Sequence, residues 1–180
     1  DCIGAYDACG VCNGPGESQC WDGSGACDLS ECPQYFQVDI DETGESSLFI
    51  FQDSISTLDA GDELGLFDLQ GVIDSDGNIG EILVGSGVWD GSQLSITAIA
   101  SVDLSDFGGP ILPGAQAGNT ISFRLWDESG QIEHEVESYD ISVGTGTFDG
   151  LFTAIEELYL PEPYFSVEIE QTGESTLFIF

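Results

Sequence analysis

Six cysteines in the first 32 residues form the densest group of chemically reactive side chains in the sequence. They lie in a stretch rich in glycine and aspartate, at Cys2, Cys9, Cys12, Cys20, Cys27 and Cys32. An even number of closely spaced cysteines is typical of a disulfide framework made in an oxidising compartment. The rival interpretation is a zinc site built on the Cys9-x-x-Cys12 spacing, but no second CxxC follows and His134 is remote. We therefore predict disulfides, whose pairing the spacing leaves open.

A second candidate site is the stretch Asp74-Ser75-Asp76-Gly77-Asn78, which places oxygen ligands at alternating positions and is followed by Glu81. Calcium is bound by several such oxygens at once. The spacing departs from an EF-hand loop, and Asp-Gly also favours a tight hairpin turn. Two interpretations stay open: a plain turn, or a calcium site formed by Asp74, Asp76, Asn78 and Glu81. Calcium is the one cofactor that we expect.

The charge of the chain excludes several classes of function. There are 34 acidic residues against one basic residue, Arg124, and the formal net charge is −33. Without a basic patch the chain cannot neutralise phosphates, so we expect no nucleic-acid partner and no anionic membrane surface. No stretch is long and apolar enough for membrane insertion. Strong self-repulsion predicts that cations gather around the folded chain.

Catalytic chemistry has little support in this sequence. His134 lies between Glu133 and Glu135, but no serine or cysteine nucleophile motif accompanies it. Lysine is absent, which removes Schiff-base chemistry and P-loop phosphate binding. Trp21, Trp89 and Trp126 would suit either a sugar-stacking platform or ordinary packing, and packing is favoured. We expect that the protein is not an enzyme.

The elements that must position these residues are strands. From Tyr35 onward, short apolar runs alternate with Gly/Asp-rich turns at intervals of about ten residues, a pattern typical of an all-β domain. The segment 35–51 has the pattern of a β-hairpin with a turn at Thr43–Ser46. Further strands are predicted at 62–68, 80–88, 93–100, 120–127, 131–139 and 152–160, of which the last would also suit a short helix. We predict an antiparallel β-sandwich, Ig-like or jelly-roll-like, over 35–160. An irregular disulfide-rich module at 1–34 precedes it.

The last 17 residues of the sequence repeat the first 17 residues of the predicted β-domain. Residues 164–180 read YFSVEIEQTGESTLFIF, and residues 35–51 read YFQVDIDETGESSLFIF, with 12 of 17 positions identical. Residues 161–180 are therefore interpreted as a linker plus the first hairpin of a next repeat, or as donated strands. An isolated hairpin is marginally stable in water and its edges invite pairing. We expect another copy to cover its apolar residues, namely Phe165, Val167, Ile169, Leu177, Phe178, Ile179 and Phe180.

Two boxes resemble a repeat domain of bacterial secreted and cell-surface multi-repeat proteins that form fibres. The first is Gly61-Asp62-Glu63-Leu64-Gly65-Leu66-Phe67-Asp68, and the second runs from Gly118-Asn119 to Trp126-Asp127. The segment at 1–34 resembles Cys/Gly/Asp-rich extracellular modules. The resemblance implies a β-sandwich in a large extracellular protein and implies no catalytic residues.

These observations lead to one expected function and one alternative. We expect a structural subunit or tandem repeat of an extracellular bacterial filament, linked head-to-tail to copies of itself through its C-terminal hairpin. The alternative is an adhesin or carbohydrate-binding module of a larger surface protein, with glycans as partners.

Overall fold

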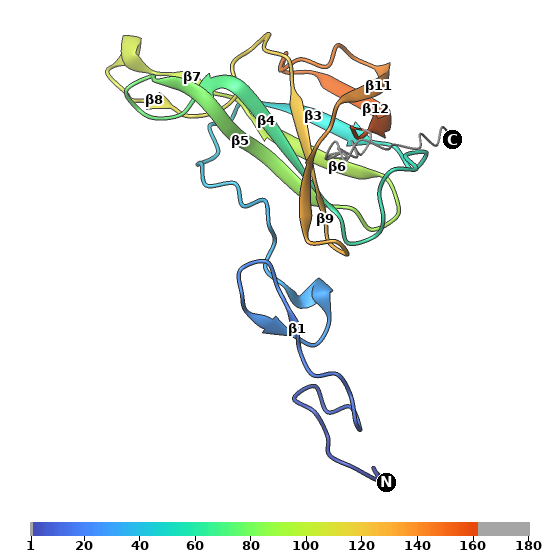
Figure 1. The fold of residues 1–180 in the computed structure, drawn as a ribbon. Helices are drawn as coiled ribbons and strands as arrows, with labels where there is room; N and C mark the ends of the chain where they lie inside the picture. Colours follow the sequence, from blue (N-terminus) through green and yellow to red (C-terminus); the bar gives the residue numbers. More distant parts are fainter. Residues whose placement is uncertain (1, 162–180) are drawn as a thin grey trace, which may run out of the picture.

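Strands make up most of the regular structure in the computed structural model, which describes residues 2–161 (Figure 1). The helical elements of this part are two short 3₁₀ turns, η1 (Leu29–Glu31) and η2 (Ser105–Phe107). The prediction of an all-β chain is thus confirmed for the described part. Within residues 2–161 no helix has the length and apolar character needed to cross a membrane.

Two four-stranded sheets form the main body of the protein. In the first sheet, the strand order is β10 (Ile132–Glu135), β9 (Ser122–Asp127), β4 (Glu63–Val72) and β5 (Ile79–Val88). In the second sheet, it is β11 (Ser138–Val143), β12 (Phe152–Tyr159), β3 (Ser46–Phe51) and β6 (Leu94–Ile99). Two smaller ladders join β1 (Ser18–Gln19) to β2 (Gly25–Ala26) and β7 (Val102–Asp103) to β8 (Ile111–Leu112).

One apolar core contains side chains from both four-stranded sheets. Alternate residues of β3 and β4 point into it, because successive side chains of a strand lie on opposite faces. Phe49 and Phe51 of β3 and Leu64 and Leu66 of β4 are fully buried there. Phe123 packs edge-to-face against both phenylalanines of β3, at centroid distances of 6.2 and 5.3 Å. Burial of these large side chains supplies the main stabilising term of the domain.

The pairing of β3 with β12 is parallel, and this corrects the expectation of a wholly antiparallel arrangement. All other pairs in the two sheets are antiparallel. Because β3 and β12 run the same way, both finish at one end of the sheets, where β4 also begins. We call this the proximal end. Chain entry at Tyr35, which bonds to Glu63, and chain exit after Tyr159 both lie there.

The predicted hairpin at 35–51 is wrong. Only its second half is a strand, β3, whereas residues 35–45 contain no strand. Both edges of β3 are already paired, with β12 on one side and β6 on the other, so no hairpin partner fits. Residues 35–45 instead run past the sheets, anchored where Ser86 Oγ donates to the Phe36 carbonyl (2.9 Å) and Thr43 Oγ1 to the Ala100 carbonyl (2.6 Å).

The predicted strand at 131–139 is two strands in two different sheets. The chain passes from β10 to β11 at Val136 and Glu137. There the Val136 N–H donates to the Phe123 carbonyl (3.1 Å) and the Glu137 N–H to the Tyr159 carbonyl (2.8 Å). The remaining predicted strands correspond to β4, β5, β6, β9 and β12, so the helical alternative for 152–160 is excluded.

Three disulfides hold together the first 34 residues, which have few buried side chains of their own. They join Cys2 to Cys12, Cys9 to Cys27 and Cys20 to Cys32, leaving no free cysteine. The zinc interpretation of Cys9 and Cys12 is therefore excluded, because each is bonded to a different cysteine. In Figure 1 this module projects from the proximal end, with the N-terminus farthest from the sheets. Its disulfides indicate folding in an oxidising compartment.

Candidate functional site

Hydrogen bonds, aromatic contacts and a cavity come together at the joint between the cysteine module and the sheets. Its centre is the dipeptide Tyr35–Phe36, which we call the plug. The plug lies on the outer face of the first sheet and forms a small second cluster with Phe67 and Trp126. The surface that receives it, formed by Glu63, Gly65, Phe67, Ser86 and Trp126, is called the socket.

Aromatic stacking fixes the first residue of the plug. The ring of Tyr35 lies parallel to the indole of Trp126, with centroids 3.9 Å apart and planes 6° apart. Its hydroxyl donates to Glu133 Oε2 (2.7 Å) on β10, and this hydrogen bond is the main cause that raises the pKa of Tyr35. Aromatic pairs of favourable geometry contribute about 0.5–1.5 kcal/mol beyond the area they bury. The ring is thus held at both its face and its tip.

A buried carboxylate holds the backbone of the plug. Glu63 accepts the N–H of Tyr35 at both oxygens (2.9 Å each) and the N–H of Phe36 at Oε2 (3.0 Å). The side chain is 7% exposed, and backbone N–H groups satisfy its charge. Loss of this carboxylate would leave two buried donors unpaired, so Glu63 defines where the chain enters the domain.

Gly65 makes room for the second residue of the plug. A Cβ atom at this position would lie 2.9 Å from Cδ1 of Phe36 and 2.8 Å from Cε2 of Phe67. The two rings pack edge-to-face, with centroids 5.8 Å apart. Any side chain at Gly65 would therefore displace the Phe36 ring, the Phe67 ring or both.

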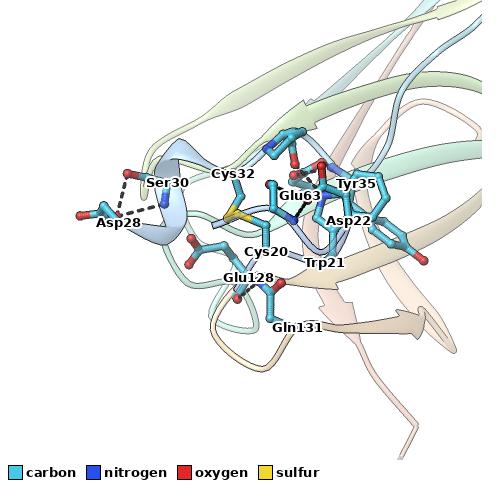
Figure 2. The surroundings of a disulfide bond; sticks show 12 residues. Cys20, Trp21, Asp22, Asp28, Ser30, Cys32, Tyr35, Glu63, Glu128 and Gln131 are labelled. Atoms are coloured by element: carbon cyan, nitrogen blue, oxygen red, sulfur yellow. Dashed lines mark hydrogen bonds between the residues drawn. A yellow bond between two sulfur atoms is a disulfide. The ribbon is translucent and has the colours of Figure 1, made fainter. Parts of the chain in front are cut away.

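The cysteine module docks on the exposed edge of this joint. Trp21 packs edge-to-face on Tyr35 at 5.3 Å, and its Nε1 donates to the Pro33 carbonyl (2.6 Å). Figure 2 shows the Cys20–Cys32 disulfide, which closes the module beside these rings, opposite Glu128 and Gln131. A cavity of about 190 Å³ lies between the two parts, lined from the module by Trp21 and Pro33 and from the sheets by Trp126, Glu128 and Gln131. The module thus extends the joint that the plug begins.

Carboxylates crowd the joint and repel one another. Burial raises the pKa of Glu128, and the nearby Asp28 and Asp62 add to the shift. Burial also raises the pKa of Asp62, which accepts the N–H groups of Asp59 (2.9 Å) and Glu128 (3.2 Å). This end of the molecule therefore stores unfavourable electrostatic energy at neutral pH.

The single arginine lies on the same face of the first sheet. Arg124 bonds to Glu81 (2.6 Å) and lies 3.5 Å from Glu133, and its guanidinium lies 4.2 Å from the centroid of the Phe67 ring. Arg124 thus faces away from the main core and pairs with carboxylates. It ties β5, β9 and β10 together beside the plug.

Asp68 of the first box and Asn119 of the second box form a contact at the end of the sheets opposite the proximal end, which we call the distal end. Asp68, 1% exposed, accepts both from Asn119 Nδ2 (3.0 Å to each oxygen) and from the N–H groups of Gln70 (2.9 Å) and Gln116 (2.8 Å). The two boxes of the sequence thus meet in space. Asp68–Asn119 joins them at the distal end, while Glu63 and Trp126 lie together in the socket.

The predicted calcium loop is a turn stabilised by its own side chains. Asp74 Oδ1 accepts the N–H groups of Asp76 (3.0 Å) and Asn78 (3.1 Å), and Oδ2 accepts from Asn78 Nδ2 (2.7 Å). The hydrogen bonds with Asn78 lower the pKa of Asp74. Glu81 is paired with Arg124. Within residues 2–161 no three His, Cys, Asp or Glu side chains are grouped closely enough to hold a metal ion, and calcium binding stays a prediction.

The other predicted site residues fall in different places. Trp89 and Trp126 are 2% and 5% exposed, so their rings pack inside the protein and are closed to a ligand. Trp21, at the joint, is 38% exposed. His134 lies half-buried on β10. The predicted inter-copy residues Phe165, Val167, Ile169, Leu177, Phe178, Ile179 and Phe180 lie outside the described residues.

The sequence alone did not predict that Tyr35 and Phe36 pack against Glu63 and Gly65. A signal was present, because Tyr-Phe opens both copies of the repeated segment and Glu63 and Gly65 belong to the first box. A comparison of the chain with protein-family models, curated sequences and solved structures finds no match.

Proposed function

We propose that the protein is a structural unit of an extracellular, multi-copy assembly, a filament or a tandem-repeat surface protein. Residues 161–180 make the connection to the next unit. The fold proposed for the unit is a β-sandwich of Ig-like or jelly-roll-like type. Support for it comes from the shared core and from a chain that crosses repeatedly between the sheets, as in Greek-key sandwiches.

The observation that carries this proposal is the match between sequence identity and burial in the repeated segment. Nine of residues 35–51 are buried or half-buried, and eight of these recur unchanged in residues 164–180. The exception is Ser47, whose hydroxyl accepts the Gly150 N–H (3.0 Å). The corresponding residue of the second segment is Thr176, which also carries a hydroxyl. The other four differences fall on exposed positions, at Gln37, Asp39, Asp41 and Glu42. This is the pattern expected if both segments fill the same structural position in two domains.

The disulfides and the surface charge support an extracellular setting. Three bridges in a small module persist where the surroundings are oxidising. The net charge of −33 keeps copies soluble and apart, and divalent cations would screen or bridge them. The alternative carbohydrate-binding function has weaker support, because two of its three candidate tryptophans are buried.

The cellular location of the protein and the mass of its polypeptide, both measured in the native source, test the proposal. Antibodies raised against the purified chain should label the cell surface or filaments in immunogold electron microscopy of intact cells. A denaturing, reducing gel should then give either discrete chains near the 19.1 kDa of this sequence or one far larger tandem polypeptide. Labelling confined to the cell interior would overturn the proposal. Glycan-array binding that is lost in Trp21→Ala would favour the adhesin alternative instead.

A further inference from the structure

One buried side-chain oxygen in residues 2–161 has no hydrogen-bond partner, and it belongs to a residue that lines the cavity at the joint. This atom is Oε1 of Gln131. The orientation of the amide is fixed, because its Nε2 donates to the Glu128 carbonyl (2.6 Å). A buried acceptor without a donor is costly, and such atoms are rare in folded proteins. A hydrogen-bond donor that entered the cavity would remove this cost.

The carboxylate of Glu128 lines the same cavity and is also without a partner. Within residues 2–161 the hydrogen bonds of Glu128 are made by its backbone, whose N–H donates to Asp62 Oδ1 (3.2 Å) and whose carbonyl accepts from Gln131. After burial, the causes that raise its pKa are neighbouring acidic side chains, Asp28 first among them. Figure 2 shows Glu128 and Gln131 on the sheet side of the joint, next to the Cys20–Cys32 disulfide. Positive charge would therefore be stabilised in this cavity.

The chain has no basic side chain to place there. It contains no lysine, and its one arginine, Arg124, is engaged by Glu81 and Glu133. A second copy of the chain has the same composition, so a contact between copies would not bring a free lysine or arginine to the cavity. A cation at this site therefore comes from a different molecule.

The donor set suits an organic cation better than a metal ion. Calcium takes about six to eight oxygen ligands, but Glu63, the other carboxylate in the cavity wall, already accepts the N–H groups of Tyr35 and Phe36. Within residues 2–161 no three His, Cys, Asp or Glu side chains are grouped closely enough for a metal ion. Ammonium and guanidinium groups carry several N–H donors and no acceptor, so one carboxylate and one amide oxygen can hold them.

The size and the aromatic wall of the cavity also fit such a group. Its volume of about 190 Å³ is below the roughly 300–1,000 Å³ of a typical small-molecule site, so it has room for a head group and a short stem. Trp21, which is 38% exposed, forms part of the wall. Tryptophan is the aromatic side chain that attracts cations most strongly.

We propose that the cavity at the joint binds the ammonium or guanidinium head group of another molecule. Glu128 and Gln131 Oε1 accept its hydrogen bonds, and Trp21 contacts it from the cysteine module. The site is additional to the proposed function and does not depend on it. Because the module and the sheets each provide part of the wall, a bound head group would also hold the module against the sheets.

Titration of the full chain with n-butylammonium chloride, followed by tryptophan fluorescence, tests this proposal, because Trp21 lines the cavity. Sodium chloride at equal ionic strength controls for screening, and n-butanol controls for the apolar stem. We expect a saturable change with n-butylammonium that neither control reproduces.

Three variants assign the response to the cavity. Glu128→Gln keeps the shape of the side chain and removes its charge, and we expect the apparent Kd to rise at least about tenfold. This variant should fold like the parent, because the Glu128 carboxylate accepts no hydrogen bond within residues 2–161. Gln131→Leu should also weaken binding. Asp106→Asn, which changes an exposed carboxylate in η2, should bind n-butylammonium like the parent.

Two results would overturn the proposal. One is the absence of a saturable response, or the same response in the parent and in Glu128→Gln. The other is a calcium response of the same signal that n-butylammonium does not compete with, because the cavity would then be a metal site.

Two peptides identify the source of the head group. Acetyl-Gly-Lys-Gly-amide is compared with acetyl-Gly-Gln-Gly-amide, which has no charge. Binding of the lysine peptide alone of the two would assign the head group to a side chain of a partner protein. Binding of n-butylammonium without either peptide would assign it to a free amine, and both results support the cation site.

Discussion

Substitution of Gly65 by alanine tests the plug and socket most directly. The new Cβ would lie 2.8 Å from Phe67 Cε2, 2.9 Å from Phe36 Cδ1 and 3.0 Å from Phe36 Cγ. These separations are far inside van der Waals contact, and overpacking of this kind costs about 1–3 kcal/mol. Replacing glycine also restricts the unfolded chain, which offsets about 0.4–1 kcal/mol. We expect a net loss of about 1–2 kcal/mol, or a melting temperature lower by about 2–8 °C for a chain of this size.

Gly80→Ala on β5 is the matched control. Its Cβ would lie 3.3 Å from Ile73 Cγ2 and 3.4 Å from Ile73 Cδ1, and the Ile73 side chain is exposed and can move, so we expect little change or a small gain. Both variants are compared by urea unfolding followed through tryptophan fluorescence.

A double-mutant cycle separates the clash from a general strand effect. In a Phe36→Ala background part of the cost of Gly65→Ala should disappear, because one of the two rings that the new Cβ strikes is gone and the Phe67 ring gains room to move. An equal loss in both backgrounds would refute the idea that Phe36 requires glycine at position 65. A loss for Gly80→Ala as large as that for Gly65→Ala would refute it as well.

Three further predictions follow from the buried carboxylates and the disulfides. Asn119→Ala should destabilise the domain by about 1.5–3 kcal/mol, because Asp68 is buried and loses a donor to both oxygens; Asn78→Ala, in an exposed turn, should cost clearly less in the same urea titration. As the pH falls from neutral, the free energy of unfolding should first rise, because burial raises the pKa of Glu128 and its protonation relieves repulsion. At pH values below 3.8, the pKa of an aspartate in the unfolded chain, the free energy of unfolding should decrease, because carboxylates such as Asp74 become protonated and lose the hydrogen bonds that lower their pKa. Thermal melts between pH 7 and 3 check both limbs, and Glu128→Gln should flatten the first limb; a stability that only falls with acidification would contradict the assignment. Removal of the Cys20–Cys32 bridge should change tryptophan fluorescence and speed proteolysis at 18–34, whereas removal of Cys2–Cys12, distant from Trp21, should leave the fluorescence unchanged.

The sequence predicted the strands whose apolar alternation is local, and it failed where distant partners decide the structure. β4, β5, β6, β9 and β12 each carry their own pattern, so their positions were predicted from residue types alone. The hairpin at 35–51 failed because β3 has both edges occupied by strands that are distant in sequence. Likewise the break at Val136 results from its contact with Phe123, which no local pattern encodes.

The candidate site was only partly predictable for the same reason. Cysteine spacing indicates bridges, but their pairing depends on the path of the folded module. Glu63 reads as one acid among 34 until the structure places it against the N–H groups of Tyr35 and Phe36. Asp74 and Glu81 are close in sequence, yet their oxygens serve a turn and an arginine respectively.

The shared position of chain entry and exit at the proximal end has a mechanical consequence. Tension applied through the two ends of the domain reaches Tyr35 first on one side, and on the other it reaches β12 at Tyr159, the last residue paired with β11. The load on the first side falls on the Trp126 stack and the three N–H bonds to Glu63 before any core side chain feels it. On the second side it would peel the ladder one bond at a time. Because both ends bear the same force, the β11–β12 ladder is the element that yields first, while the joint at Tyr35–Phe36 holds the other end of the domain.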